Sequence, residues 1–296
     1  MKSSAFDYVR AESPEQVYSL LALHGEDMRL LAGGQTLLAT LNMRLSSPAL
    51  VVDIGGLAAL RGIGLQDSGG QRVLRIGALT RHVEIEESAL VAQHAPLLVQ
   101  AAPHIAHRAI RNLGTFGGAL AYADPAAEWP ACALALNATL VLGSAQGDRR
   151  VAAADFFQGL YSTALLPEEL LLACEVPVLQ AGERQHFDEL ARRQGDYALA
   201  GLAARAVWLE GRLQGLRLAF LSLADRPVRA LAAEAVLQSG LLTPERIAAA
   251  DAALREELKP YADLCHSAAA KTQFAATLMR RALKHLAGSP HTTGPH

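Results

Sequence analysis

The chain has 296 residues, of which 51% are hydrophobic and 19% are charged, and its formal net charge is −2. This length and composition are typical of a globular protein with two or three packed units. The near-neutral charge and the lack of a Lys/Arg run argue against nucleic acid and against an anionic membrane surface as partners.

The termini and the cysteines point to an ordinary intracellular protein. The first thirty residues lack the basic and apolar segments of an export signal, and no stretch reaches the ~20 apolar residues of a membrane span. We therefore expect a soluble, cytoplasmic protein without a membrane span. Cys132, Cys174 and Cys265 are far apart and have no metal-ligand spacing. We expect them to be small buried hydrophobic residues rather than members of a disulfide framework, a zinc site or an iron–sulfur cluster.

The first 55 residues alternate helix-like and strand-like segments. Ser13 and Pro14 predict the start of a helix that ends at Gly25. The apolar runs MRLLAGG and ALVVDIGG predict buried strands of a small α/β lobe, because each ends at paired glycines. LLATLNMRL, which follows the first of these glycine pairs, is expected to be helical.

Residues 56–177 are expected to form a second lobe. GGQRVLRIGALT predicts a turn and a strand, and the segment that follows predicts helices interrupted at Pro96 and Pro103. NATLVLGSAQGDRRVAAADFF predicts a hairpin, and EELLLACEVPV predicts another strand.

Residues 178–288 are expected to form a C-terminal α+β domain with a small antiparallel sheet and helices. The polar segment VLQAGERQHFDELARRQGDYA indicates a connector, and the apolar runs after it predict strands broken at Gly211 and Gly215. Thr243, followed by proline, predicts the start of one helix, and AAAKTQFAATLMRRALKHL predicts another. Residues 289–296 are expected to be a frayed tail.

Two glycine pairs have a chemistry that suits an anion. Gly33–Gly34 is followed by Gln35 and Thr36, and Gly117–Gly118 is preceded by Thr115. Glycine lets another molecule approach the backbone, so that successive N–H groups can converge on an anion, and a helix N-terminus favours phosphate. Neither segment fits GxGxxG or a P-loop. Each pair taken alone is more often a simple turn.

The order of several motifs carries a resemblance to a known family. These motifs are AGGQTLLATLNMRL, LVVDI, IGALTRH, RNLGTFGGALAYADPAAEWPA and RRQGDYALAG. Together they resemble the FAD-binding medium subunit of the xanthine dehydrogenase and aerobic carbon monoxide dehydrogenase family of molybdenum hydroxylases. The resemblance covers nearly the whole chain. It implies an α+β protein with an FAD-binding fold of the p-cresol methylhydroxylase/vanillyl-alcohol oxidase type, in which two α/β lobes clamp the FAD and a C-terminal domain follows.

The resemblance also implies which residues bind the FAD. Two diphosphate loops correspond to Ala32, Gly33, Gly34, Gln35, Thr36 and Leu37, and to Thr115, Phe116, Gly117, Gly118 and Ala119. We expect a side chain at Gly33 or Gly34 to stand where the phosphate oxygens meet the backbone.

Four further positions match family positions near the cofactor. They are Asp124, Glu128, Leu171 and Tyr197, and the resemblance places the tyrosine near the flavin ring. The residues alone leave other roles open: a turn or helix cap for Asp124, a core position for Leu171 and half-buried packing for Tyr197.

The function that the resemblance implies is electron transfer. FAD in this chain would receive electrons from a small subunit with two [2Fe–2S] clusters, while a large subunit with the molybdopterin cofactor oxidises the substrate, commonly in a dimer of heterotrimers. This chain would then contain no catalytic residue and no metal ligand of the hydroxylation site. Two alternatives are a self-sufficient FAD-dependent oxidase or dehydrogenase and a non-catalytic assembly protein that has lost FAD. The substrate and the electron acceptor stay open.

The chain also departs from the family pattern. Many members have a lysine shortly before the RR motif, where this chain has Asp188 and Glu189. It lacks the cysteine-rich loop of relatives that reduce hydroxybenzoyl-CoA. The RR pair at 192–193 is expected to be a solvated basic face, and the HxxH pair that begins at His104 has no third ligand nearby and is expected to bind no metal.

Overall fold

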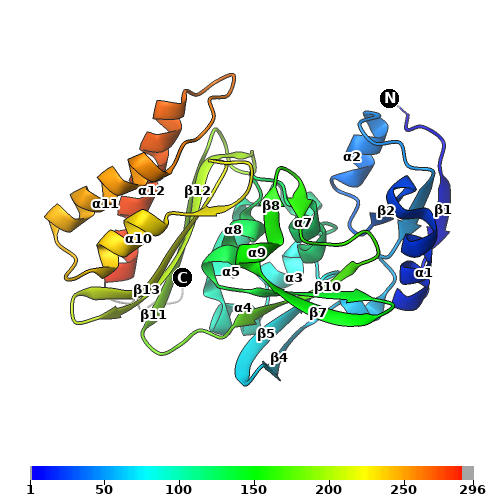
Figure 1. Cartoon of the computed structure of the whole chain (residues 1–296), viewed down its shortest axis with the longest axis horizontal. Helices are drawn as coiled ribbons and strands as arrows, with labels where there is room; N and C mark the ends of the chain where they lie inside the picture. Colours follow the sequence, from blue (N-terminus) through cyan, green and yellow to red (C-terminus); the bar gives the residue numbers. More distant parts are fainter. Residues whose placement is uncertain (1, 289–296) are drawn as a thin grey trace.

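The structure is a computed structural model that describes residues 2–288. It arranges them as three units, with the blue N-terminal unit and the yellow-to-red C-terminal unit on opposite sides of a central unit (Figure 1). The expected tail, residues 289–296, lies outside the described residues. No described helix combines the length and the apolar character needed to cross a membrane.

The N-terminal unit is a parallel three-stranded sheet in the order β1-β3-β2 with two helices. Its elements are β1 (Asp7–Arg10), α1 (Pro14–His24), β2 (Met28–Leu31), α2 (Leu37–Asn42) and β3 (Leu50–Asp53). The Ser13 hydroxyl accepts the Gln16 N–H and so caps α1, as the sequence predicts. β1 was not predicted, because DYVR is mostly exposed and has no apolar run.

The central unit is an antiparallel sheet in the order β4-β5-β10-β6-β7 with a set of short helices. Its strands are β4 (Ile63–Ser68), β5 (Gln71–Gly77), β6 (Thr139–Ser144), β7 (Gly147–Ala152) and β10 (Leu170–Pro177), with a small hairpin of β8 (Phe157–Gly159) and β9 (Ser162–Thr163). Its helices are α3 (His82–Glu86), α4 (Ala89–His94), α5 (Pro96–Ala101), α6 (Arg108–Arg111), α7 (Phe116–Tyr122), α8 (Glu128–Ala135) and α9 (Ala153–Phe156). The predicted hairpin is β6–β7, and the break at Pro96 is the start of α5.

The C-terminal unit is a second antiparallel sheet, in the order β11-β12-β13-β14, with helices packed on it. Its elements are β11 (Glu183–Ala191), β12 (Ala198–Leu209), β13 (Arg212–Leu221), β14 (Val228–Arg229), α10 (Leu231–Gln238), α11 (Pro244–Glu257) and α12 (Ala268–Ala287). Thr243 caps α11 through its hydroxyl, as predicted.

Two sequence interpretations in this unit were wrong. The expected connector contains β11, which pairs with β12 along its whole length. Its polar side chains find partners on the neighbouring elements, as when Gln185 Oε1 accepts the Leu97 N–H of α5 at 3.0 Å. Gly215 does not break the chain but lies inside β13, where its φ of 58° accompanies a shift in the pairing with β12.

The expectation for the cysteines was correct at two positions of three. Cys132 and Cys174 are buried, whereas Cys265 is exposed, because it lies in the segment that joins α11 to α12.

Apolar packing is continuous from one unit to the next. Leu79 and Leu172 of the central unit pack in the N-terminal core, and Phe187 and Leu221 of the C-terminal sheet pack in the central core. The units therefore support one another rather than standing alone. The division after residues 55 and 177 stays a prediction from the sequence.

Candidate functional site

The first glycine loop, residues 32–36, connects β2 to α2. Gly34 has a left-handed backbone with φ of 72°, and Gln35 folds its side-chain amide onto the Gly33 carbonyl at 2.9 Å. Within residues 2–288, the backbone N–H groups from Ala32 to Leu37 have no hydrogen-bond acceptor. A run of free N–H groups on a curved backbone is a donor surface that suits an anion.

Gly33 is required by a close approach between the two lobes. A Cβ at this position would lie 2.3 Å from the Leu113 carbonyl oxygen and 2.8 Å from the Gly114 Cα. These are backbone atoms that cannot rotate away. A side chain at Gly33 would therefore strike the central unit, and its expected clash with phosphate oxygens stays a prediction.

The second glycine loop, residues 115–119, uses most of its backbone donors within the fold. The N–H groups of Phe116 and Gly117 donate to carbonyls just after β5, and those of Gly118 and Ala119 donate to the Thr115 hydroxyl and carbonyl oxygens. In the described part of the chain, only the Thr115 N–H of this loop lacks an acceptor. The second loop therefore fixes the start of α7 and leaves one hydroxyl and one N–H for a ligand, whereas the first loop leaves a row of N–H donors.

The two glycine loops are neighbours in space. Besides the contact of Gly33 with residues 113–114, a Cβ at Gly118 would lie 3.9 Å from the Ala32 Cβ. The structure thus brings together two segments that are far apart in the sequence, as the resemblance implies.

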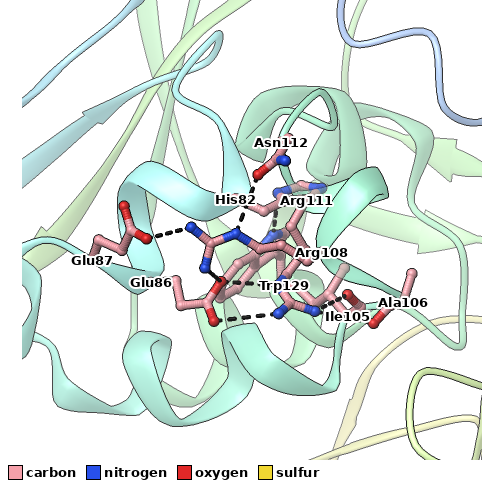
Figure 2. Close-up of polar contacts among 9 residues, drawn as sticks. All are labelled: His82, Glu86, Glu87, Ile105, Ala106, Arg108, Arg111, Asn112 and Trp129. Atoms are coloured by element: carbon pink, nitrogen blue, oxygen red, sulfur yellow. Dashed lines mark hydrogen bonds and ion pairs between the residues drawn. The ribbon is translucent and has the colours of Figure 1, made fainter.

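A buried polar network supports the segment that leads into the second loop (Figure 2). Arg111 forms an ion pair with Glu86, with 2.9 Å between Nε and Oε2, and donates to the carbonyls of Ile105 and Ala106. The Trp129 indole N–H donates to His82 Nδ1 at 2.9 Å. Burial, together with the nearby guanidinium, lowers the pKa of His82 to about 4. His82 is therefore neutral at pH 7 and accepts this bond.

At the C-terminal end of α7 lies the tyrosine group, which consists of Tyr122, Tyr161 and Tyr197. The rings of Tyr122 and Tyr161 are 5.0 Å apart, and Tyr197 lies close enough to both for their charges to interact. Their exposed fractions are 37%, 52% and 70%. Partial burial is the largest cause that raises the pKa of each phenol.

Asp124 lies next to these tyrosines and makes a turn. Its carboxylate accepts the Ala126 N–H at 2.9 Å. The same carboxylate is among the charges that raise the pKa values of Tyr122, Tyr161 and Tyr197. Asp124 therefore has the turn role that the sequence left open, and this turn keeps its negative charge close to the three tyrosines.

Glu128 begins α8 just behind Asp124 and is buried. Burial raises the pKa of its carboxyl to about 8, and the nearby carboxylate of Glu189 contributes to the rise. No role was predicted for Glu189, one of the two acids that stand where many family members have a lysine. Tyr122 and Tyr161 were also missed, because isolated tyrosines in the sequence give no sign that they meet.

Comparison with known families accounts for most of the chain. Residues 4–179 match the family described as FAD binding domain in molybdopterin dehydrogenase, and residues 185–286 match the CO dehydrogenase flavoprotein C-terminal domain. The chain belongs to the family of FAD-binding medium subunits of molybdenum hydroxylases. These proteins are subunits of molybdopterin-dependent oxidoreductases.

Relatives of this medium subunit match over nearly its full length. It is 40% identical over 285 residues to the 6-hydroxypseudooxynicotine dehydrogenase complex subunit alpha of Paenarthrobacter nicotinovorans, which covers 96% of this chain and 95% of that protein. It is 34% identical over 279 residues to the carbon monoxide dehydrogenase medium chain of Hydrogenophaga pseudoflava, with 94% and 96% covered.

Solved structures confirm the expected fold class of this medium subunit. A structure of the Hydrogenophaga pseudoflava carbon monoxide dehydrogenase, which lacks the Mo-pyranopterin moiety, matches with a TM-score of 0.92 and 35% identity over 97% of this chain and 98% of that chain. Quinoline 2-oxidoreductase from Pseudomonas putida 86 matches with a TM-score of 0.89 and 36% identity over 97% and 98%.

The medium subunit has a site whose chemistry fits FAD. The pyrophosphate of FAD is an anion that accepts several hydrogen bonds, and the first loop offers six consecutive N–H donors that no group among residues 2–288 accepts. Leu171 shows no sign of a contact with FAD, because it is 4% exposed and packs within the central core.

Proposed function

We propose that this chain is the electron-transfer subunit of a heterotrimeric molybdenum hydroxylase. It binds FAD and passes electrons from the [2Fe–2S] clusters of a small partner subunit to an external acceptor. A large partner subunit holds the molybdopterin cofactor and oxidises the substrate, and two heterotrimers associate in the cytoplasm. FAD supplies the ability to accept electrons singly and release them in pairs.

The observation that carries this proposal is the run of free backbone donors at residues 32–37. These residues are half-buried or exposed, so an anion can accept from their N–H groups in place of water without breaking a hydrogen bond of the fold. The pyrophosphate would accept from these donors, and the hydroxyl and free N–H of Thr115 lie in the adjacent loop.

The spacing along α7 supports placing the flavin ring at the tyrosine group. α7 begins beside the second loop and ends at Tyr122, and seven residues of helix span ~10 Å. The seven bonds from the flavin ring to the first phosphorus span ~8 Å when extended. A pyrophosphate at one end of α7 therefore puts the ring beside Tyr122, Tyr161 and Tyr197, where an aromatic face would pack against it.

The proposed FAD contacts keep every position that the resemblance implies. They are Ala32, Gly33, Gly34, Gln35, Thr36, Leu37, Thr115, Phe116, Gly117, Gly118, Ala119, Asp124, Glu128, Leu171 and Tyr197. Backbone groups act at the first loop, and side chains act at Thr115 and at the tyrosine group.

The substitution Thr36→Asp tests the donor loop. Thr36 is exposed, and its side chain caps no N–H of α2, so an acidic residue there leaves the fold intact. Its carboxylate would add a negative charge to the loop that is proposed to hold the pyrophosphate, and like unit charges ~4 Å apart repel each other by ~1–4 kcal/mol near a protein surface. We expect the Kd for FAD to rise about ten- to hundredfold.

Two variants control for this test. In Thr36→Asn the new side chain has nearly the same shape as aspartate but no charge, so its Kd for FAD should stay within about threefold of the wild-type value. Thr243→Asp adds the same charge at the residue before another helix, α11, and should leave the Kd for FAD unchanged. Unchanged FAD affinity in Thr36→Asp would remove the main support for the proposal.

A further inference from the structure

Neither glycine loop of the proposed FAD site contains a basic residue. Residues 30–37 and 112–124 include no lysine or arginine. The pyrophosphate of FAD carries a negative charge on each phosphate, whereas backbone N–H groups offer only partial positive charges. A full positive charge for this ligand would have to come from a segment beside the loops.

Arg81 lies in such a segment, between β5 and α3, and is paired with Thr115 of the second loop in an antiparallel β-bridge. The Phe116 N–H donates to the carbonyl of the residue before Arg81 at 2.8 Å, and the N–H of the residue after Arg81 donates to the Gly114 carbonyl at 3.0 Å. Because these two bonds flank the bridge, Arg81 and Thr115 form a non-hydrogen-bonded pair, in which the side chains project to the same side with ~4.5 Å between the Cα atoms. The Arg81 side chain therefore leaves the backbone next to the Thr115 side chain.

The Thr115 side chain marks the side on which the two glycine loops meet. Its hydroxyl accepts the Gly118 N–H at 3.2 Å. A Cβ at Gly118 would lie 2.7 Å from this hydroxyl and 3.9 Å from the Ala32 Cβ in the first loop. An arginine side chain extends ~7 Å from Cα to the guanidinium nitrogens. Arg81 is therefore within reach of the junction between the loops, where the pyrophosphate is proposed to bind.

The charge of Arg81 is not used by the fold. Within residues 2–288, its guanidinium has no hydrogen-bond or ion-pair partner, although the residue is half-buried. The Glu84 carboxylate instead accepts the backbone N–H of Arg81 at 2.7 Å and lies 4.0 Å from the Arg61 Nε. Both arginines of α6 pair with Glu86. The fold thus fixes the backbone of Arg81 and leaves its guanidinium for a ligand.

We propose that Arg81 binds FAD by donating from its guanidinium to the pyrophosphate oxygens. This proposal rests on the proposed function, and Arg81 is not among the positions that the resemblance implies. The planar guanidinium has several N–H groups that can donate to two oxygens of a phosphate at once. The N–H groups of the first loop supply neutral hydrogen bonds, and Arg81 supplies the positive charge that the loops lack.

A titration of the FAD-free full chain with FAD tests this contact. Arg81→Met keeps most of the apolar stem and removes the charge, so the Kd for FAD should rise about ten- to hundredfold, the range for a hydrogen bond to a charged group. Arg81→Lys keeps the charge without the planar geometry and should recover part of the affinity. The wild-type Kd should also rise between about 0.05 and 0.5 M NaCl, and it should rise less in Arg81→Met, because salt screens the charge that the variant lacks.

Arg75→Met is the matched control for this titration. Arg75 is a second half-buried arginine of the central unit, but it lies on β5 opposite Glu175 in the pairing with β10, rather than beside a glycine loop. Its replacement should leave both the Kd for FAD and the salt dependence of the Kd at the wild-type values.

A chemical measurement on the wild type does not depend on how the variants fold. Bound FAD should protect Arg81 from modification by phenylglyoxal, as measured by mass spectrometry of peptides, and should leave the modification of Arg75 unchanged. Equal modification of Arg81 with and without bound FAD would overturn the proposal, and so would an Arg81→Met protein with the wild-type Kd and salt dependence. A wild-type chain that binds no FAD would instead refute the proposed function.

Discussion

The substitution Gly33→Ala should destabilise the protein even when no cofactor is present. The added Cβ would lie 2.3 Å from the Leu113 oxygen, against 3.4–4 Å for an ordinary contact, so one of the two loops must move by about 1 Å. Both neighbours are backbone atoms, so we expect a loss in the free energy of unfolding at the upper end of the range for overpacked cores, about 3 kcal/mol. For a protein of this size the corresponding decrease in Tm is about 5 °C or more.

Thermal unfolding of the FAD-free protein, followed by circular dichroism, measures this effect. Gly64→Ala is the matched control, because a Cβ there meets nothing within 4 Å and the backbone is not left-handed; it should leave Tm within about 2 °C. An FAD-free Gly33→Ala protein with wild-type Tm would refute the argument that the contact between the lobes requires this glycine.

The polar network around His82 and Arg111 and the exposed Tyr197 allow three further predictions. The pKa of His82 is about 4 in the folded protein and about 6.5 in the unfolded chain. The free energy of unfolding should therefore fall by up to ~3 kcal/mol as the pH decreases from 6.5 toward 4. Urea unfolding at several pH values should show a smaller fall in His82→Asn than in the wild type. Arg111→Met should cost about 1–3 kcal/mol in urea unfolding, because it removes the guanidinium that pairs with Glu86 and donates to the carbonyls of Ile105 and Ala106, whereas Arg108→Met should cost less than about 1 kcal/mol, because Arg108 is half exposed. Tyr197→Ala should raise the Kd for FAD about tenfold in a fluorescence titration, and Tyr261→Ala, equally exposed but outside the tyrosine group, should not change it.

Local signals in the sequence were enough to predict the starts of two helices and the presence of several strands. Ser13 and Thr243 cap helices as expected, since a hydroxyl before a proline is a strong start signal. The hairpin of β6 and β7 and the buried strand β10 were also predicted correctly, because their composition matches their environment.

The errors occur where distant residues decide the outcome. β11 has a polar sequence typical of a connector, and it is a strand because β12 supplies its hydrogen bonds and α5 and α12 supply polar partners. The bulge at Gly215 likewise depends on the register with β12, which a single segment does not reveal.

The candidate site was predictable in part. The resemblance pointed to both glycine loops, and the structure brings them into contact. The sequence could not show that the two loops differ, with free donors in the first and donors mostly used by the fold in the second.

The most direct test of the account is the flavin content of the full chain. The protein is purified under native conditions, denatured by heat, and the released cofactor is identified by chromatography and quantified by absorbance. The account predicts about one FAD per chain, and rebinding of added FAD by the FAD-free protein at equal stoichiometry. A correctly folded chain that releases no flavin and takes up none would contradict it.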